Sequence, residues 1–127
     1  MTSPGGSAFR PLNAAEDEIA CLRRADSEPP EALREAVVRV THAVEATLRR
    51  LLRDDPGADL ELRLHALDPE ELSADEVVAD LRRRNVLPLE LAAGFHELVG
   101  VRARGRRGEP LGPAEAALAL RVADGVR

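Results

Sequence analysis

The stretch PPEALREAVVRVTHAVEATLRRLLRDD, residues 29–55, carries the clearest structural signal in this sequence. Its apolar residues recur at steps of three or four, which places them on one face of a helix that turns by about 100° per residue. They are Leu33, Val37, Val40, Val44, Leu48 and Leu51. The two prolines suit the first turn of a helix, and DDPG at 54–57 suits its end. The pattern predicts a long amphipathic helix from Glu31 to about Arg53, with Arg49 on its polar side.

Two weaker segments lie on either side of this helix. Asn13 is followed three residues later by Glu16, which is the spacing of a capping box, so we expect a helix over 14–25. Residues 60–67, LELRLHAL, alternate as a strand would, but the sequence shows no strand with which they could pair. Since Leu, Glu and Arg also favour helices, we expect a short helical or irregular segment there.

Three further helices follow. A second capping box, Ser73 with Glu76, opens a helix over 73–85. Others are expected over 88–104 and 113–126, each beginning at a proline. The last is apolar on nearly all sides, so we expect it to be buried or to lie at a subunit contact. Together with the long helix, these segments predict an all-α fold, an up-and-down four-helix bundle with a short extra N-terminal helix.

Composition limits the class of protein. At 127 residues the chain has the size of one domain. Residues 1–12 are rich in Gly, Ser and Pro, so we expect a disordered N-terminal tail there and one helical domain over 13–127. The chain has no Trp or Tyr and only two Phe, so its core must be aliphatic. No run of 18 apolar residues and no signal-peptide pattern occurs, which predicts a cytoplasmic protein that does not span a membrane.

The charged residues narrow the chemistry further. The net charge of −5 argues against nonspecific binding of duplex nucleic acid over the whole surface but leaves room for one basic patch. All 18 basic residues are Arg, and the single Cys excludes a disulfide framework within the chain. We find no metal-ligand spacing, no Gly-rich phosphate loop and no Ser-His-Asp arrangement. The sequence therefore predicts no metal site and no cofactor.

The stretch LVGVRARGRRGEPLG, residues 98–112, places four arginines at the end of an apolar helical segment. Arg102 continues the apolar face of this helix, whereas Arg104 lies well off it. Gly105 and Gly108 suggest that the helix frays at this point. A guanidinium on a core-facing stripe needs a carboxylate, a carbonyl or an anion, because burying it unpaired is costly. Two interpretations stay open, a structural salt bridge and an anion-binding site.

The segment VRARGRRGEPL, residues 101–111, resembles the signature of HEPN domains, the higher eukaryote and prokaryote nucleotide-binding family. That family carries an Arg-Asn pair at the end of a core helix and a His-Gly pair a few residues later. Arg102 and Gly108 match two of these positions, but Ala103 stands in place of the Asn and Arg107 in place of the His. With its flanking helices, the resemblance covers roughly residues 31–126. It implies a helical bundle that forms a homodimer.

Many HEPN domains are metal-independent ribonucleases, in which Arg holds the phosphate and His moves a proton. Arg107 cannot act as a base near neutral pH, so the resemblance implies no catalytic residue and a protein that is not an enzyme. Neither His42 nor His96 shares the helix face of Arg102, and His65 lies in the uncertain segment.

We therefore expect a non-catalytic HEPN-like module that dimerises, binds another protein, or binds the phosphate of RNA or a nucleotide. The predicted anion-binding residues are Arg102, Arg104, Arg106 and Arg107. Two alternatives remain, a HEPN-type ribonuclease with a degenerate motif and a plain helical interaction domain.

Overall fold

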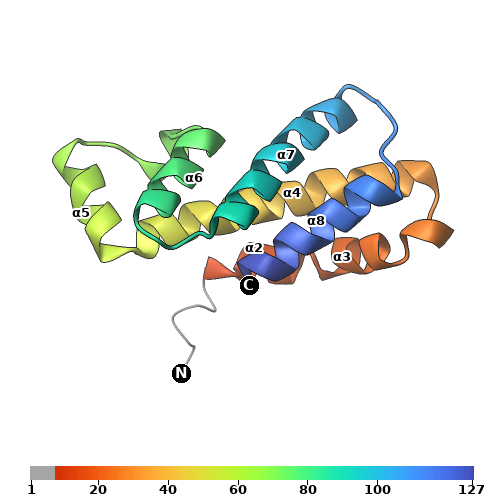
Figure 1. The fold of residues 1–127 in the computed structure, drawn as a ribbon, viewed down its shortest axis with the longest axis horizontal. Coiled ribbons are helices and arrows are strands. Elements are labelled where there is room, and N and C mark those ends of the chain that lie inside the picture. The colour runs from red at the N-terminus through yellow and green to blue at the C-terminus, as the bar shows by residue number, and fades with distance from the viewer. Residues whose placement is uncertain (1–7) are drawn as a thin grey trace.

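A computed structural model describes residues 8–127, and every regular element in that range is helical. The longest helix, α4 (Pro30–Asp54), runs along the length of the molecule (Figure 1). It confirms the helix predicted from Glu31 to about Arg53. Its buried face follows the predicted apolar stripe as far as Leu48 and then continues at Leu52, while Leu51 is half-buried.

The N-terminal region differs from the prediction. Residues 1–7 of the expected tail lie outside the described residues, but the expectation is wrong for the rest. Helix α2 (Arg10–Ala14) packs on α4 and buries Leu12 completely. A second helix, α3 (Glu16–Arg23), follows directly. Asn13 is not an N-cap, because it lies inside α2 and its backbone N–H donates to the carbonyl of Phe9.

Three helices pack along α4. They are α3, α7 (Leu89–Arg106) and α8 (Pro113–Val126). The end of α7 lies near the beginning of α4, since Gly105 approaches Val38, so α7 runs antiparallel to α4. Helix α8 returns alongside α7, with Gly125 against Leu91 near the start of α7. Helix α3 also packs on both α4 and α8, so it is part of the main helical assembly instead of an accessory to it.

The remaining helices pack on the C-terminal part of α4, at the opposite end of the molecule from the α7–α8 loop (Figure 1). Helix α5 (Pro56–Leu64) confirms a helical segment within 60–67, and α6 (Ala74–Arg83) begins at the predicted cap. There the Ser73 hydroxyl accepts a hydrogen bond from the Glu76 N–H at 3.1 Å. Short 3₁₀ turns occur at Ala25–Ser27 (η1) and Pro69–Glu71 (η2).

Helices α5, α6 and α7 end in the same way. The residues just beyond them, Ala66, Asn85 and Gly108, have φ angles of 52°, 59° and 85°. In each case the next N–H donates back to a carbonyl in the last turn of the helix, as Leu67 does to Leu62 at 2.8 Å. This is the Schellman motif, in which the left-handed position favours glycine. The sequence predicted the end near Asn85, whereas it placed the end of α7 at about residue 104, and Ala66 carries no such signal.

Helix α7 does not fray at Gly105, contrary to our expectation. It continues to Arg106, and Gly105 is buried between α4 and the loop that follows α7. A Cβ at this position would lie 3.0 Å from both Val38 and Leu111. Glycine is therefore present here because two segments approach closely, and the helix continues through it to Arg106.

The core is aliphatic, as predicted from composition, and Phe95 is the largest side chain that is fully buried. Helix α8 contributes Leu118, Ala119 and Val122 to this core, although its Ala114 and Ala117 are exposed. Within residues 8–127, no helix combines the length and the apolar character needed to cross a membrane.

Candidate functional site

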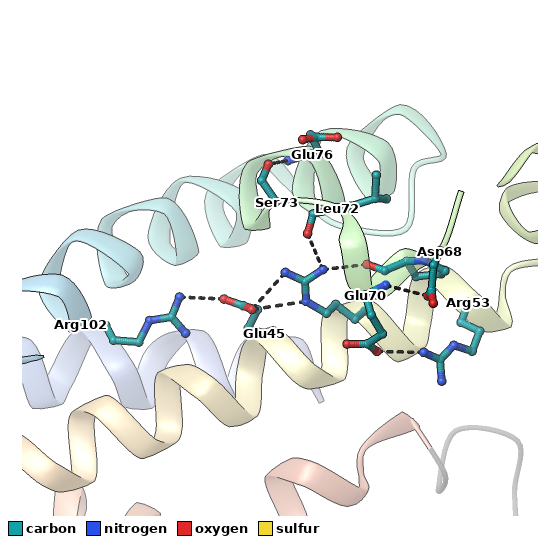
Figure 2. Close-up of polar contacts among 10 residues, drawn as sticks. Glu45, Arg53, Asp68, Glu70, Leu72, Ser73, Glu76 and Arg102 are labelled. Carbon is teal, nitrogen blue, oxygen red and sulfur yellow. Dashed lines mark hydrogen bonds and ion pairs between the residues drawn. The ribbon is translucent and has the colours of Figure 1, made fainter. Parts of the chain in front are cut away.

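Arg102 lies on the core-facing side of α7, as its position on the helical wheel predicted, and only 8% of the residue is exposed. Its guanidinium is not open to solvent. The Arg102 Nη2 atom donates a hydrogen bond to Oε1 of Glu45 on α4, at 2.7 Å. Figure 2 shows the two side chains pointing toward one another from their helices. The structure thus gives Arg102 a carboxylate partner within its own chain.

Glu45 binds a second arginine through its other oxygen. Arg49, one turn later on α4, donates to Glu45 Oε2 from Nη2 at 3.1 Å and from Nε at 3.3 Å. Burial by itself favours the neutral form of the Glu45 carboxyl. Hydrogen bonds and positive charge from Arg102 and Arg49 outweigh that effect, so the pKa of Glu45 lies below its ordinary value. Glu45 is therefore ionised at neutral pH and is shared by two guanidiniums.

Arg49 also ties a loop to α4. Its Nη1 atom donates to the carbonyl oxygens of Pro69 at 2.7 Å and Leu72 at 2.6 Å, the first residue of the η2 turn and the residue that follows it. Only 12% of the Arg49 side chain is exposed, because the η2 turn covers the side of α4 on which the sequence placed it. The four-residue spacing of Glu45 and Arg49 was the one feature of the sequence that indicated their pairing.

The network of Arg102, Glu45 and Arg49 joins α4, α7 and the η2 turn through charge-assisted hydrogen bonds. Arg49 donates from all three of its guanidinium nitrogens and Arg102 from Nη2, in every case to atoms of the chain itself. The arrangement is suited to holding three segments together.

The other three predicted arginines do not converge on Arg102. Arg104 is exposed and lines a cavity beside Glu115 and Arg121 of α8. Arg106 faces the beginning of α4, in a cavity with Arg34 and Arg39. Arg107 follows the last residue of α7 and pairs with Glu109 at 3.3 Å. Successive residues of a helix are separated by about 100°, so these side chains leave α7 in different directions.

The three histidines also lie apart. His42, His65 and His96 are all exposed, on α4, after α5 and on α7 respectively. His42 is on the solvated side of α4, as predicted. His96 contacts Asp75 of α6 at 3.2 Å, and both of these side chains are 75% exposed. In the described part of the chain, no hydrogen bond joins a histidine to Arg102, so the structure assembles no Arg–His pair there.

Metal-binding and thiol chemistry have little support. Among residues 8–127, no group of three or more His, Cys, Asp and Glu side chains is placed to hold a metal ion. Cys21 is half-buried, and its thiol contacts the carbonyl of Ala32 at 3.9 Å. Burial chiefly, with the nearby charge of Glu28, raises the pKa of Cys21, which lowers the fraction of reactive thiolate.

Sequence reasoning missed two surface features. One is a cavity of about 380 Å³ between α5 and α6, whose lining includes Leu62, His65 and Glu76. The other is the outer side of α5, where Leu60 and Leu64 are 61% and 74% exposed. The alternation of Leu60, Leu62 and Leu64 was the sequence feature from which the exposed side of α5 could have been predicted. In a helix this spacing places Leu62 on the opposite side from its two neighbours.

No family model, no curated protein and no solved structure matches this chain. The resemblance to HEPN domains therefore stays a prediction.

Proposed function

We propose that this chain is a non-catalytic helical association module, and that two copies bind each other through the outer face of α5. The exposure of Leu60 and Leu64 carries the proposal. These leucines lie four residues apart and so share one side of the helix. Leu62 packs inward on the other side, so α5 is apolar on two opposite faces, of which this chain covers one.

The chemistry of this face indicates the kind of partner. The face presents two aliphatic side chains, Leu60 and Leu64, both more than half exposed. Exposed aliphatic side chains that lie close together mark association surfaces more often than isolated ones do. They offer no hydrogen bonds, and a second aliphatic stripe complements them. Another copy of this chain presents the same leucine stripe and can therefore complement it. Two-fold dimers are also the commonest soluble assemblies.

Two observations favour a non-catalytic role. Arg107 stands where the related ribonucleases carry a proton-transferring His, and a guanidinium stays protonated at neutral pH. Arg102, at the position of the phosphate-holding Arg, is bound by Glu45 at 2.7 Å. An incoming phosphate would have to displace that carboxylate. Phosphate binding at Arg102, the leading anion contact expected from the sequence, is therefore disfavoured.

We further propose that α3, α4, α7 and α8 form an up-and-down bundle of the HEPN type. Helices α4 and α7 are antiparallel and α8 returns along α7, which is the alternation that such a bundle requires. Helices α5 and α6 would then be an insertion between the second and third helices of the bundle. This places the leucine face on the insertion, away from the Arg102 position.

Sedimentation velocity tests the association. The wild-type protein should show a reversible monomer–dimer equilibrium over about 10 to 200 µM, as expected for a small interface. The Leu60→Ser/Leu64→Ser double variant should remain monomeric. Leu89→Ser is the matched control, because Leu89 is 64% exposed but lies at the start of α7. A wild-type protein that stays monomeric throughout, or a dimer that survives the double substitution, would contradict the proposal.

An RNA-cleavage assay tests the non-catalytic part separately. Purified wild-type protein and Arg102→Ala should both leave a labelled single-stranded RNA intact. Cleavage by the wild type that Arg102→Ala abolishes would establish the ribonuclease alternative instead.

A further inference from the structure

A narrow groove runs along the beginning of α4, where the end of α7 crosses it. Two adjoining cavities form it, with volumes of about 280 Å³ and 210 Å³, and both are lined by Arg34 and Gly108. The α4 residues that line it extend from Pro30 to Arg39, which corresponds to about 14 Å of helix. The groove is therefore longer than a single small ion requires.

Two glycines of the α7 end form one wall of the groove. Gly105 allows α7 to approach Val38, and Gly108 turns the chain away with a φ of 85°. A Cβ at Gly108 would lie 3.7 Å from Nη1 of Arg34, in ordinary contact with that side chain. The backbone at this position therefore lies close to the Arg34 side chain, which is 29% exposed.

Three arginines line the groove. Arg34 and Arg39 come from α4, and Arg106 comes from α7. The Arg106 side chain forms no hydrogen bond or ion pair with any residue in the range 8–127. Against these three charges the lining contains only two carboxylates, those of Glu31 and Glu35. With Glu18 of α3, which also pairs with Arg39, three carboxylates contact Arg34 and Arg39, and none of them contacts Arg106. Arg106 therefore leaves a positive charge without a carboxylate partner in the groove.

The arginines of α4 are held by long contacts, and two of their three partners, Glu31 and Glu35, are exposed. Arg34 contacts Glu31 at 3.5 Å, and Arg39 contacts Glu18 at 3.4 Å and Glu35 at 3.7 Å. Surface ion pairs at such distances stabilise a fold little, so an incoming carboxylate can replace them. These contacts also show that the guanidiniums already lie where carboxylates can reach them.

We propose that this groove binds an extended acidic segment of a partner protein, with carboxylates on Arg34, Arg39 and Arg106. An extended chain advances about 3.3 Å per residue, so the groove length matches about four residues. Val38 and the two glycines offer an apolar wall against which peptide backbone and aliphatic stems can lie. This surface is separate from the leucine face of α5, and the proposal is independent of self-association.

Charge complementarity alone would also admit RNA, but the groove lacks the other element of single-strand recognition. RNA binding usually stacks bases on aromatic side chains. The two Phe residues are the whole aromatic content of the chain, and neither Phe9 nor Phe95 lines the groove. Phe95 is buried in the core.

Titration of ¹⁵N-labelled full-length protein with a capped tetraglutamate peptide at low salt tests this site. We expect saturable amide shifts at Val38, Gly105 and Gly108. The Arg106→Gln variant should weaken binding by about five- to tenfold, as loss of a charge-assisted hydrogen bond predicts. Arg104→Gln is the control, since it removes the same charge two residues away from an exposed position outside the groove. It should change affinity by less than about twofold.

Octauridylate, titrated in the same way, separates RNA from peptide. Binding of octauridylate at the groove with higher affinity than tetraglutamate, and with the same loss in Arg106→Gln, would overturn the proposed occupant. Equal weakening of the peptide by Arg104→Gln and Arg106→Gln would show nonspecific attraction and would also overturn the proposal. The absence of any amide shift at Val38, Gly105 and Gly108 would also overturn the proposal. Because Arg106 has no described partner to lose, its replacement is expected to leave the fold intact.

Discussion

Arg102 of α7 and Glu45 of α4, 57 residues apart in the chain, form an ion pair at 2.7 Å in which both side chains are largely buried. Arg49 binds the other oxygen of the same carboxylate. A single negative charge therefore balances two arginines at the contact between α4, α7 and the η2 turn. Because one carboxylate serves two arginines, replacing Glu45 and replacing Arg102 should destabilise the fold by different amounts.

Glu45→Gln should destabilise the fold more than Arg102→Leu. The first change leaves two largely buried guanidiniums without a carboxylate, and we expect it to cost about 3 kcal/mol. The second leaves Glu45 with Arg49 and should cost about 1 to 2 kcal/mol. Urea unfolding followed by circular dichroism measures both free energies. Equal losses of unfolding free energy in the two variants would show that the Arg49 charge does not need Glu45 to balance it.

Stability should also depend on pH through Glu45. Its pKa in the folded chain lies below the ordinary value, so the network stabilises the fold fully above the unfolded-state pKa of about 4.3. As pH falls from there toward the folded-state pKa, this contribution is lost. The free energy of unfolding of the wild type should therefore approach that of Glu45→Gln between about pH 5 and pH 3. A difference between the two proteins that stays constant over this range would contradict the assignment.

Two glycines of α7 should respond in opposite ways to alanine. A Cβ at Gly94 would lie 2.8 Å from Cγ2 of Val122, a stiff side chain of α8, whereas a Cβ at Gly100 would meet nothing within 4 Å. We expect Gly94→Ala to cost about 1 to 3 kcal/mol through overpacking. Gly100→Ala should instead stabilise the helix by about 1 kcal/mol. Thermal unfolding of the two variants tests the sign of each effect, and the same sign for both would be incompatible with the α7–α8 contact.

Ala66→Gly should stabilise the protein. Ala66 has a φ of 52°, the left-handed conformation that is unfavourable for residues with a Cβ. Glycine removes this penalty but increases the entropy of the unfolded chain, so we expect a net gain of about 0.5 to 1 kcal/mol. The control is Ala93→Gly, at an exposed position inside α7, which should cost about 1 kcal/mol. Chemical denaturation of both variants measures the difference, and destabilisation by Ala66→Gly would refute the motif at the end of α5.

Local sequence determined the helices and most of their limits. The period of the apolar residues predicted α4 almost to the residue, because one amphipathic face must be buried whichever neighbours cover it. The cap at Ser73 and the left-handed end at Asn85 were readable because each depends on side-chain chemistry within a few positions. The same period placed Arg102 on the buried side of α7.

Only the tertiary structure decided what these elements meet. The sequence required that Arg102 find an acceptor, but a contact over 57 residues depends on how α7 crosses α4, so Glu45 was not identifiable. Arg49 is covered because the η2 turn lies over α4, and no local pattern encodes that cover. Likewise, Arg106 joins Arg34 and Arg39 across a groove that exists only after packing. Helix periodicity is a property of adjacent residues, whereas ion pairs and grooves arise from the positions of whole helices.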